Sequence, residues 1–234
     1  MIGETSGWTA APERPTLLPG EAHVWRASGG PDAAALARSA FVLSDDERAR
    51  AARLHFERDR IRFIRAHGVL REVLARYLAA PPARLSFVKG PFGKPSIAGS
   101  ALEFNLSHCE DMVVVAISGC GAVGVDVERV RDMPDAKSLA AHFFAPAENA
   151  ALAAAPVSER RGLFFSIWTR KEAYVKATGE GLSRPLDSFE AARLEPPPPP
   201  CAALCDLPLG PWHAGALASF GTIGRLQLHD FAEA

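Results

Sequence analysis

Residues 113–127 read VVVAISGCGAVGVDV, and this stretch decides how the chain is divided. Its first part, Val113 to Ile117, is a continuous apolar run, which is typical of a strand covered on both faces. Gly119-Cys120-Gly121 then turns the chain, and Val123 to Val127 alternates with the period of a strand. A helix followed by strands is expected on each side of this turn. The sequence therefore predicts an α+β fold of two halves, with a seam near Gly119 to Gly121.

The chain is predicted to have three parts, a leader and the two halves that meet at this seam. Residues 1–20 are rich in Pro, Gly and Thr and are expected to form a loose leader. Residues 21–120 are assigned to an N-terminal α+β half, and residues 121–234 to a C-terminal α+β half. The proline run Pro196 to Pro200 is expected to form an external loop between two strands.

Helix and strand signals place the elements within these halves. Ser44 and Glu47 form a capping box that opens a long arginine-rich helical region, which Pro81-Pro82 ends. Pro146 starts a second helix, and Ser158 caps a third that ends near Thr178. Strands are expected at Ala22 to Ala27, Leu85 to Val88, Leu102 to Leu106 and Leu186 to Leu194, and a last pair at Ala214 to Phe220 and Gly224 to Leu228.

Composition restricts the possible classes of protein. The 234 residues are 48% apolar and 23% charged, with a formal net charge of −1. This is typical of a globular protein and gives no overall field that favours nucleic acid or an anionic membrane. The N-terminus lacks the basic head and apolar stretch of a signal peptide, and no apolar run approaches the roughly 18 to 20 residues that span a bilayer. The four cysteines form no Cys-x-x-Cys pair, so buried thiols in a reducing cytoplasm are expected.

Asp126 and Glu128 form the first acidic motif. Strand alternation puts both on the face opposite to Val125, about 6.6 Å apart. Two such carboxylates repel each other, by about 4 kcal/mol at 4 Å for an effective dielectric constant near 20. A divalent cation relieves this repulsion, or one group takes up a proton. Oxygen ligands without His or Cys favour Mg²⁺ over zinc. The alternative is two solvated side chains on an open sheet face.

A second motif lies in residues 168–182, WTRKEAYVKATGEGL, at the end of the third helix. Glu172 and Lys176 are about one turn apart, so they share a face at about 6 Å. Gly179 is expected to end the helix in a left-handed cap. Taken alone, the pair is also typical of routine surface stabilisation. Together with Asp126 and Glu128, it predicts a carboxylate that holds a metal and an ammonium that reaches a phosphate of the same ligand.

Gly119 to Gly124 also matches the dinucleotide-binding pattern Gly-x-Gly-x-x-Gly. That pattern requires a helix directly after the glycines, so that the helix N-terminus meets the pyrophosphate. Here a strand pattern follows instead. A Rossmann fold is therefore rejected.

The motifs resemble the paired signature of the 4′-phosphopantetheinyl transferase superfamily, Sfp type. The resemblance covers residues from about 44 to 190. It rests on Gly124-Val125-Asp126-Val127-Glu128, Trp168-Thr169-Arg170-Lys171-Glu172, Lys176-x-x-Gly179-x-Gly181-Leu182, Phe92-Gly93-Lys94-Pro95, Phe104-Asn105-Leu106-Ser107-His108 and Phe143-Phe144-x-x-x-Glu148.

The resemblance implies two similar α+β halves related by a pseudo-twofold axis in a monomer, with coenzyme A in the cleft between them. It implies Mg²⁺-dependent transfer of phosphopantetheine to a serine of an acyl or peptidyl carrier protein, with release of 3′,5′-ADP, in the assembly of secondary metabolites. The implied metal ligands are Asp126, Glu128 and Glu172. The implied coenzyme A contacts are Arg50, Arg62, Lys94, Asn105, Ser107, His108 and Lys176. Glu172, directly or through a metal-bound water, is expected to take the serine proton, and Lys176 or His108 to stabilise the departing phosphate.

Other functions stay open on the sequence. One is a non-catalytic module that binds a carrier protein or a nucleotide. Another is a Mg²⁺-dependent coenzyme A pyrophosphatase, in which water replaces the serine. A nucleic-acid binder is disfavoured because acidic residues are interleaved with the arginines of the first helical region.

Overall fold

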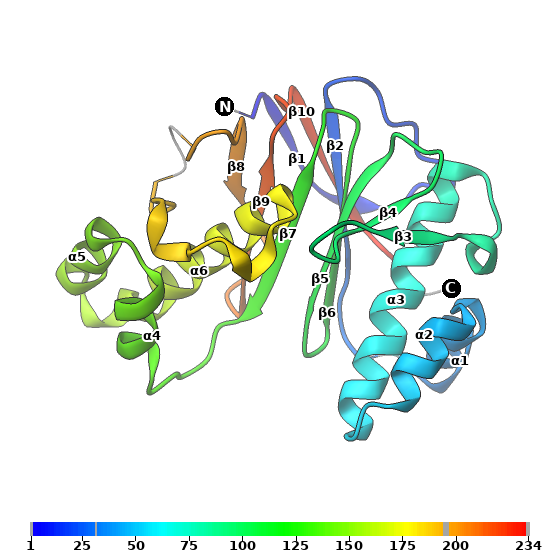
Figure 1. Cartoon of the computed structure of the whole chain (residues 1–234), viewed down its shortest axis with the longest axis horizontal. Coiled ribbons are helices and arrows are strands. Elements are labelled where there is room, and N and C mark those ends of the chain that lie inside the picture. The colour runs from blue at the N-terminus through cyan, green and yellow to red at the C-terminus, as the bar shows by residue number, and fades with distance from the viewer. Residues whose placement is uncertain (1, 31, 194–196, 233–234) are drawn as a thin grey trace.

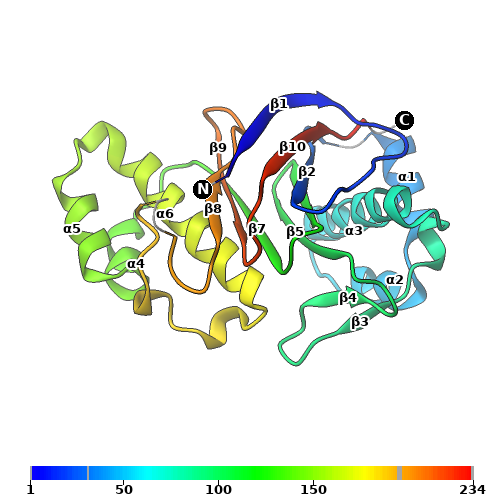
Figure 2. The same ribbon diagram turned by 90° about the horizontal axis from the view of Figure 1, so that it is seen from above.

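The computed structural model describes residues 2–30, 32–193 and 197–232. Two β-sheets lie at the centre of the molecule, and helices cover the outside of each (Figure 1, Figure 2). The five-stranded sheet has the order β1 (Glu4–Ala10), β10 (Arg225–Asp230), β2 (Glu21–Ala27), β6 (Met112–Ser118) and β5 (Glu103–Cys109). The three-stranded sheet has the order β7 (Val123–Arg129), β9 (His213–Ser219) and β8 (Ala203–Asp206). A separate hairpin is formed by β3 (Phe87–Lys89) and β4 (Pro95–Ile97).

Each sheet is covered on its outer face by one long helix. On the five-stranded side this is α3 (Glu57–Leu78), against which α1 (Ala33–Val42) and α2 (Asp45–Ala52) pack. On the three-stranded side it is α6 (Val157–Thr178), with α4 (Ala136–Phe143) and α5 (Pro146–Ala154) outside it. Short 3₁₀ helices span Pro82–Arg84, Gly181–Ser183 and Leu186–Ser188. The arrangement confirms the predicted α+β class.

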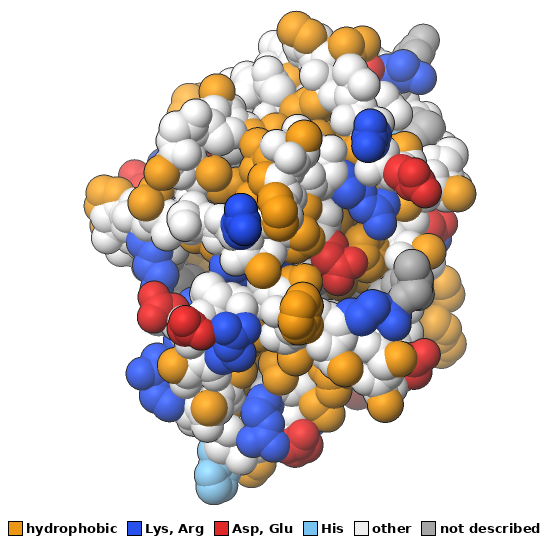
Figure 3. All heavy atoms as spheres, turned by 90° about the vertical axis from the view of Figure 1, so that its right-hand side faces the viewer, with side chains coloured by type: hydrophobic (Ala, Val, Ile, Leu, Met, Phe, Trp, Pro, Cys, Tyr) orange, Lys and Arg blue, Asp and Glu red, His pale blue; other side chains and the backbone are white. Residues whose placement is uncertain are grey.

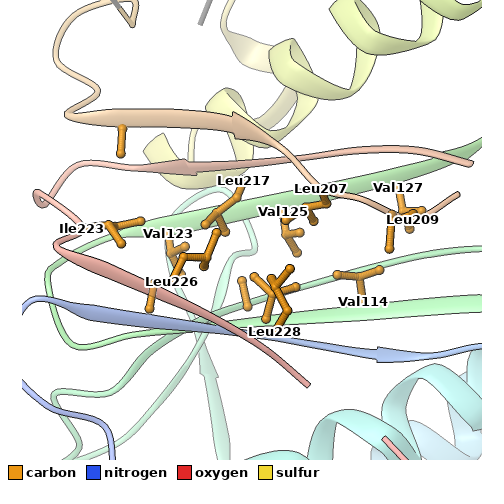
Figure 4. Close-up of a cluster of buried hydrophobic side chains, with 14 of the residues drawn as sticks. Val114, Val123, Val125, Val127, Leu207, Leu209, Leu217, Ile223, Leu226 and Leu228 are labelled. Carbon is orange, nitrogen blue, oxygen red and sulfur yellow. The ribbon is translucent and has the colours of Figure 1, made fainter. Parts of the chain in front are cut away.

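The two sheets share one hydrophobic core between their inner faces. Val114 and Leu228 of the five-stranded sheet belong to the same buried cluster as Val125 and Leu217 of the three-stranded sheet (Figure 4). Every residue of β6 is buried, as predicted from its continuous apolar run. Burial of this apolar surface, at about 25 cal/mol per Å², is what joins the two halves.

The alternation predicted for β7 is confirmed. Val123, Val125 and Val127 lie in the core between the sheets. The opposite face of β7 packs against α6, and Gly124 lies at the closest approach. A Cβ atom at Gly124 would overlap Ala173 O and the backbone nitrogen of Ala177. A glycine is therefore required here for α6 to lie directly on β7.

The expectation of a loose N-terminal leader is wrong. Residues 4–10, assigned to a loose leader, form β1, which pairs in parallel with β10. Trp8 of this strand donates from Nε1 to Pro208 O at 2.7 Å and lies under the guanidinium of Arg26. The two last strands are confirmed as β9 and β10, but they lie in different sheets, because β10 crosses to the five-stranded sheet and lies between β1 and β2. The last strand of the C-terminal half is thus part of the N-terminal sheet.

Several element boundaries differ from the predictions. The arginine-rich helical region is two helices, α2 and α3, separated at residues 53–56, and α1 precedes them. The capping box at Ser44 is confirmed, with Glu47 Oε2 accepting from the Ser44 backbone nitrogen at 2.9 Å. Ser158 lies inside α6, whose N-cap is Pro156, and Gly179 caps the other end at φ 75° as expected.

The strand predicted from Leu186 to Leu194 is wrong over residues 186–193, and Leu194 lies outside the described residues. Buried side chains satisfy this backbone instead of a neighbouring strand. Lys171 Nζ donates to Leu186 O at 2.7 Å and to Phe189 O at 2.5 Å. Glu148 Oε1 accepts from the backbone nitrogen of Ala191 at 2.5 Å. In the described part of the chain, no helix is both long enough and apolar enough to cross a bilayer.

Candidate active site

The two acidic motifs meet where α6 lies on β7. Lys176 Nζ of α6 is 2.6 Å from Asp126 Oδ1 of β7 and 3.0 Å from Ser107 Oγ of β5. Ser107 Oγ also donates to Asp126 Oδ1 at 2.9 Å. The other carboxylate oxygen, Asp126 Oδ2, is buried without a hydrogen-bond partner. Asp126 therefore has one neutralised oxygen and one that still requires a positive or donating group.

Burial and the charge of Asp126 change the pKa values of Glu128 and Glu172. Burial, then the charge of Asp126, raises the pKa of Glu128 to about 7, and Glu172 adds to the rise. Burial, followed by Asp126, also raises the pKa of Glu172, while Lys176 opposes that change. The carboxylate forms of Glu128 and Glu172 are thus each destabilised by the negative charge of Asp126, a condition that a divalent cation relieves.

The oxygen atoms of Asp126, Glu128 and Glu172 are of the kind that a magnesium ion requires. Within residues 2–30, 32–193 and 197–232, no group of three His, Cys, Asp or Glu side chains is already arranged to hold a metal ion. The chemistry nevertheless fits Mg²⁺, which prefers oxygen ligands and usually keeps a few carboxylates together with ligand phosphates. The unpartnered Asp126 Oδ2 and the two carboxyl groups with raised pKa supply such oxygens.

Asn105 and Ser107 connect the two sheets. Asn105 Oδ1 accepts from the Val125 backbone nitrogen at 2.9 Å, and Ser107 Oγ accepts from the Val127 backbone nitrogen at 3.3 Å. Both side chains are buried. Asn105 and Ser107 therefore face β7 instead of solvent. Their side chains bind the β7 backbone where no hydrogen bonds of a shared sheet join these two edge strands. Ser107 in addition touches the Asp126–Lys176 pair.

Lys94 makes a second connection between the halves. Its Nζ donates to Val123 O at 2.9 Å and to Ala177 O at 3.1 Å. Ala177 is in the last turn of α6, where carbonyl groups lack helical partners and favour a cation. Burial lowers the pKa of Lys94, and the charge of Glu103 opposes this. The structure thus gives Lys94 a structural role, and its contact with coenzyme A stays a prediction.

A cavity of about 620 Å³, the basic cavity, opens between α3 and the ends of β5 and β7. His108 is an exposed residue on the wall of this cavity. Partial loss of hydration lowers the pKa of His108 to about 4, and the positive charges of His67, Lys176 and Arg62 contribute. The charged and aromatic residues that line the cavity are Arg58, Asp59, Arg62, Phe63, His108, Glu110, Glu128, Arg129 and Arg131.

The predicted coenzyme A contacts are only partly gathered in the basic cavity. Arg62 and His108 line it, together with the metal-ligand candidate Glu128. Arg50 is exposed on α2, with its guanidinium carbon 5.1 Å from the centroid of the cavity-lining Phe63 ring. Lys94, Asn105 and Ser107 are not among the lining residues.

A second cavity of about 500 Å³, the apolar cavity, is lined by α4, α6 and residues 184–187. Glu172 is on its wall, while Phe143, Trp168 and Leu186 form its apolar surface. Its polar lining residues are His142, Glu172, Arg184 and Asp187. One proposed metal ligand therefore lines each cavity, Glu128 the basic cavity and Glu172 the apolar cavity.

A buried ion pair that the sequence did not predict supports the helix that carries Glu172. Glu148 and Lys171 form a fully buried ion pair at 2.7 Å. Glu148 also accepts from the Ala145 backbone nitrogen at 2.8 Å, so one carboxylate fixes the start of α5, α6 and the backbone at Ala191. Both residues were part of motifs already noted, but a pair separated by more than twenty positions leaves no periodic signal in a sequence.

Comparisons with known proteins identify the family of the chain. The family model "4′-phosphopantetheinyl transferase superfamily" matches residues 122–227, and the model "4′-phosphopantetheinyl transferase, N-terminal" matches residues 27–119. The 4′-phosphopantetheinyl transferase HetI of Nostoc sp. is 39% identical over 189 residues, which is 79% of each chain. The transferase Sfp of Bacillus subtilis is 30% identical over 148 residues, 63% of this chain and 65% of the relative. The transferase gsp of Aneurinibacillus migulanus is 35% identical over 132 residues, 56% of this chain and 54% of the relative.

The two adjacent family models and the relative HetI all indicate a 4′-phosphopantetheinyl transferase, and HetI is matched over most of both chains. The resemblance noted in the sequence is therefore confirmed, and the chain belongs to the 4′-phosphopantetheinyl transferase superfamily, as a transferase of the Sfp type.

Proposed function

We propose that the chain transfers the 4′-phosphopantetheine arm of coenzyme A to a serine of an acyl or peptidyl carrier protein, with release of 3′,5′-ADP. The single observation that carries this proposal is that Glu128 lines the basic cavity and Glu172 lines the apolar cavity, while the charge of Asp126 acts on both. Coenzyme A has a highly charged nucleotide end and a largely apolar arm, and the reacting diphosphate joins them. The two cavities match its two ends.

The basic cavity is assigned to the nucleotide end. Arg62 and His108 supply positive or donating groups, and Arg50 lies at the rim beside Phe63. The apolar cavity is assigned to the pantetheine arm, because Phe143, Trp168 and Leu186 offer it apolar contact and Arg184 and Asp187 offer hydrogen bonds. This assignment places the diphosphate beside Glu172 and Lys176.

The transfer step needs few groups. The carrier serine Oγ attacks the phosphorus that bears pantetheine, and the bond from this phosphorus to the oxygen of the 3′,5′-ADP phosphate breaks. Glu172 accepts the serine proton, since its raised pKa makes its carboxylate a stronger base. Lys176, already turned toward Asp126, stabilises charge on the departing phosphate together with His108.

Asp126, Glu128 and Glu172 are proposed to hold Mg²⁺. When bound, this ion supplies charge neutralisation at the diphosphate. The protein's own contribution is orientation. Ser107 and Lys176 fix one oxygen of Asp126, while Gly124 lets α6 bring Glu172 onto β7. We further propose that the chain acts as a monomer, since both halves of one chain contribute to one site. We also propose that it acts in the cytoplasm.

The test is mass spectrometry of several apo-carrier proteins incubated with the enzyme, coenzyme A and Mg²⁺. A carrier that gains one phosphopantetheine supports the proposal. Glu172→Gln is expected to abolish the gain while coenzyme A still binds, and Glu159→Gln, on the exposed first turn of α6, is expected to behave as the wild type. Cleavage of coenzyme A without a carrier would instead indicate a pyrophosphatase. Binding without either reaction would indicate a non-catalytic module.

A further inference from the structure

A buried polar chain lies behind the rim of the basic cavity. Glu47 of α2 is buried and accepts from Arg71 Nε at 2.6 Å. Its other oxygen, Oε1, is 3.1 Å from His67 Nδ1 of α3. Burial alone would raise the pKa of Glu47, but hydrogen bonds from His67, Arg71 and the Ser44 backbone lower it to about 2. Glu47 is therefore a carboxylate at neutral pH.

The charge of Glu47 fixes the tautomer of His67. A carboxylate only accepts hydrogen bonds, so His67 Nδ1 carries the hydrogen in this contact. The imidazole plane is thereby held by a buried partner on one side. This kind of support, a carboxylate that orients a histidine, is stronger than a neutral hydrogen bond.

His67 in turn supports the cavity wall. Its ring stacks on the ring of Phe63, with centroids 4.1 Å apart and an interplanar angle of 27°. The guanidinium carbon of Arg50 is 5.1 Å from the centroid of the same Phe63 ring, within cation–π range. Phe63 lines the basic cavity beside Arg62 and His108. A line of contacts therefore runs from Glu47 through His67 and Phe63 to Arg50.

The surroundings explain why Arg50 needs such support. The face formed by α1 to α3 shows basic, acidic and apolar side chains mixed together, without a field of one sign (Figure 3). Acidic residues accompany many of the arginines there, as in the Arg48–Asp45 and Arg60–Glu57 pairs. An exposed arginine on this surface is free to adopt many conformations, and fixing it costs side-chain entropy. The Phe63 ring reduces this cost for Arg50.

We propose that Glu47 and His67 are positioning residues of the anion subsite, which hold the Phe63 ring so that Arg50 meets the terminal, 3′-phosphate of coenzyme A. The proposal rests on the proposed function, which places the nucleotide end in the basic cavity. Neither residue is assigned contact with the substrate. The groups that face His67 are Glu47 from α2 and Phe63 from α3, and its charge acts on His108 of β5.

Two substrates separate this role from a general structural one. Coenzyme A carries the 3′-phosphate and dephospho-coenzyme A does not. We measure KM and kcat for both substrates, and their dissociation constants by calorimetry without a carrier. For His67→Ala, we expect KM for coenzyme A to rise about fivefold, the order of one lost cation–π contact. Its kcat and all constants for dephospho-coenzyme A are expected to stay within about twofold of wild type.

Two further variants identify the contact responsible. His67→Phe keeps a ring against Phe63 but loses the hydrogen bond to Glu47, so it is expected to restore the KM for coenzyme A only in part. Phe63→Leu keeps apolar volume without a ring and is expected to reproduce His67→Ala. Equal losses for both substrates, or no restoration by His67→Phe, would overturn the proposal. If the wild type binds coenzyme A but transfers nothing, the proposed function fails, while the calorimetric comparison still decides the role of His67.

Discussion

Lys176 Nζ lies 2.6 Å from Asp126 Oδ1, and this ion pair connects helix α6 to strand β7 at the centre of the site. Asp126 is buried and Lys176 is partly exposed. A buried carboxylate without its cation is costly, so the pair fixes both the position and the charge of the centre.

Lys176→Met should therefore cost stability as well as activity. We expect a loss of about 1–3 kcal/mol in the free energy of unfolding, because Asp126 is left buried beside Ser107 alone. Adding Asp126→Asn should recover part of this loss. Urea unfolding of the wild type, both single variants and the double variant, all in metal-free buffer, measures the coupling. Purely additive effects would show that the two groups do not interact.

Gly124→Ala should displace α6 from β7. The new Cβ would overlap backbone atoms of Ala173 and Ala177, which cannot move aside as a side chain does. Overpacking of this kind costs about 1–3 kcal/mol, and here it also separates Glu172 from Asp126. Transfer activity is expected to be lost in a chain that still folds.

Gly162→Ala is the matched control for this substitution. Gly162 lies in the exposed part of α6 and has no atom within 4 Å of an added Cβ. We expect this variant to keep full activity and to gain up to about 1 kcal/mol, the helix propensity difference. Thermal unfolding and transfer assays of both variants make the comparison. Normal activity of Gly124→Ala would contradict the close packing described.

Glu128 should make stability and metal affinity depend on pH. Its pKa is raised to about 7 from an ordinary value of 4.5, so between these values the folded state holds the proton more tightly than the unfolded state. In metal-free buffer, the free energy of unfolding should fall as pH rises through this window. Glu128→Gln should remove that dependence and be about 1–3 kcal/mol more stable at pH 8.

Mg²⁺ should show the opposite trend in the wild type. Binding requires the carboxylate, so the stabilisation by Mg²⁺ should increase as pH rises through about 7. Thermal unfolding at several pH values, with and without Mg²⁺, checks both trends. A pH-independent difference between wild type and Glu128→Gln would count against the shifted pKa.

Trp8→Ala should destabilise the chain, although residues 1–20 read as a leader. Trp8 donates to Pro208 O and packs against the core between the sheets. We expect a loss of about 1–3 kcal/mol, because a packed aromatic side chain is removed. Trp212→Ala is the control, since Trp212 is 63% exposed and should change stability by no more than about 0.5 kcal/mol. Equal effects would indicate that β1 contributes little.

The local features of the site were predictable from the sequence. Alternation in β7 placed Asp126 on the face away from Val125, and Gly179 marked the end of α6. These signals are carried by neighbouring residues and by a fixed period. The capping box at Ser44 is of the same kind.

Long-range features were not predictable in this way. A strand pattern does not say which strand is its neighbour, so the crossing of β10 between β1 and β2 was missed. Asn105 was expected only to contact coenzyme A, yet it accepts a hydrogen bond from the Val125 backbone of the other sheet. The backbone at Ala191 looked extended, but Glu148 takes its N–H group. In each case the partner lies far away in the chain.

The central claim is that Asp126, Glu128 and Glu172 hold one divalent ion beside the diphosphate of coenzyme A. Mn²⁺ is a suitable probe because it also prefers oxygen ligands, and its binding can be counted by electron paramagnetic resonance. With coenzyme A present, we expect one tightly bound Mn²⁺ per chain in the wild type and in Glu159→Gln. We expect that ion to be lost in Glu172→Gln. Unchanged Mn²⁺ binding by Glu172→Gln would contradict the claim.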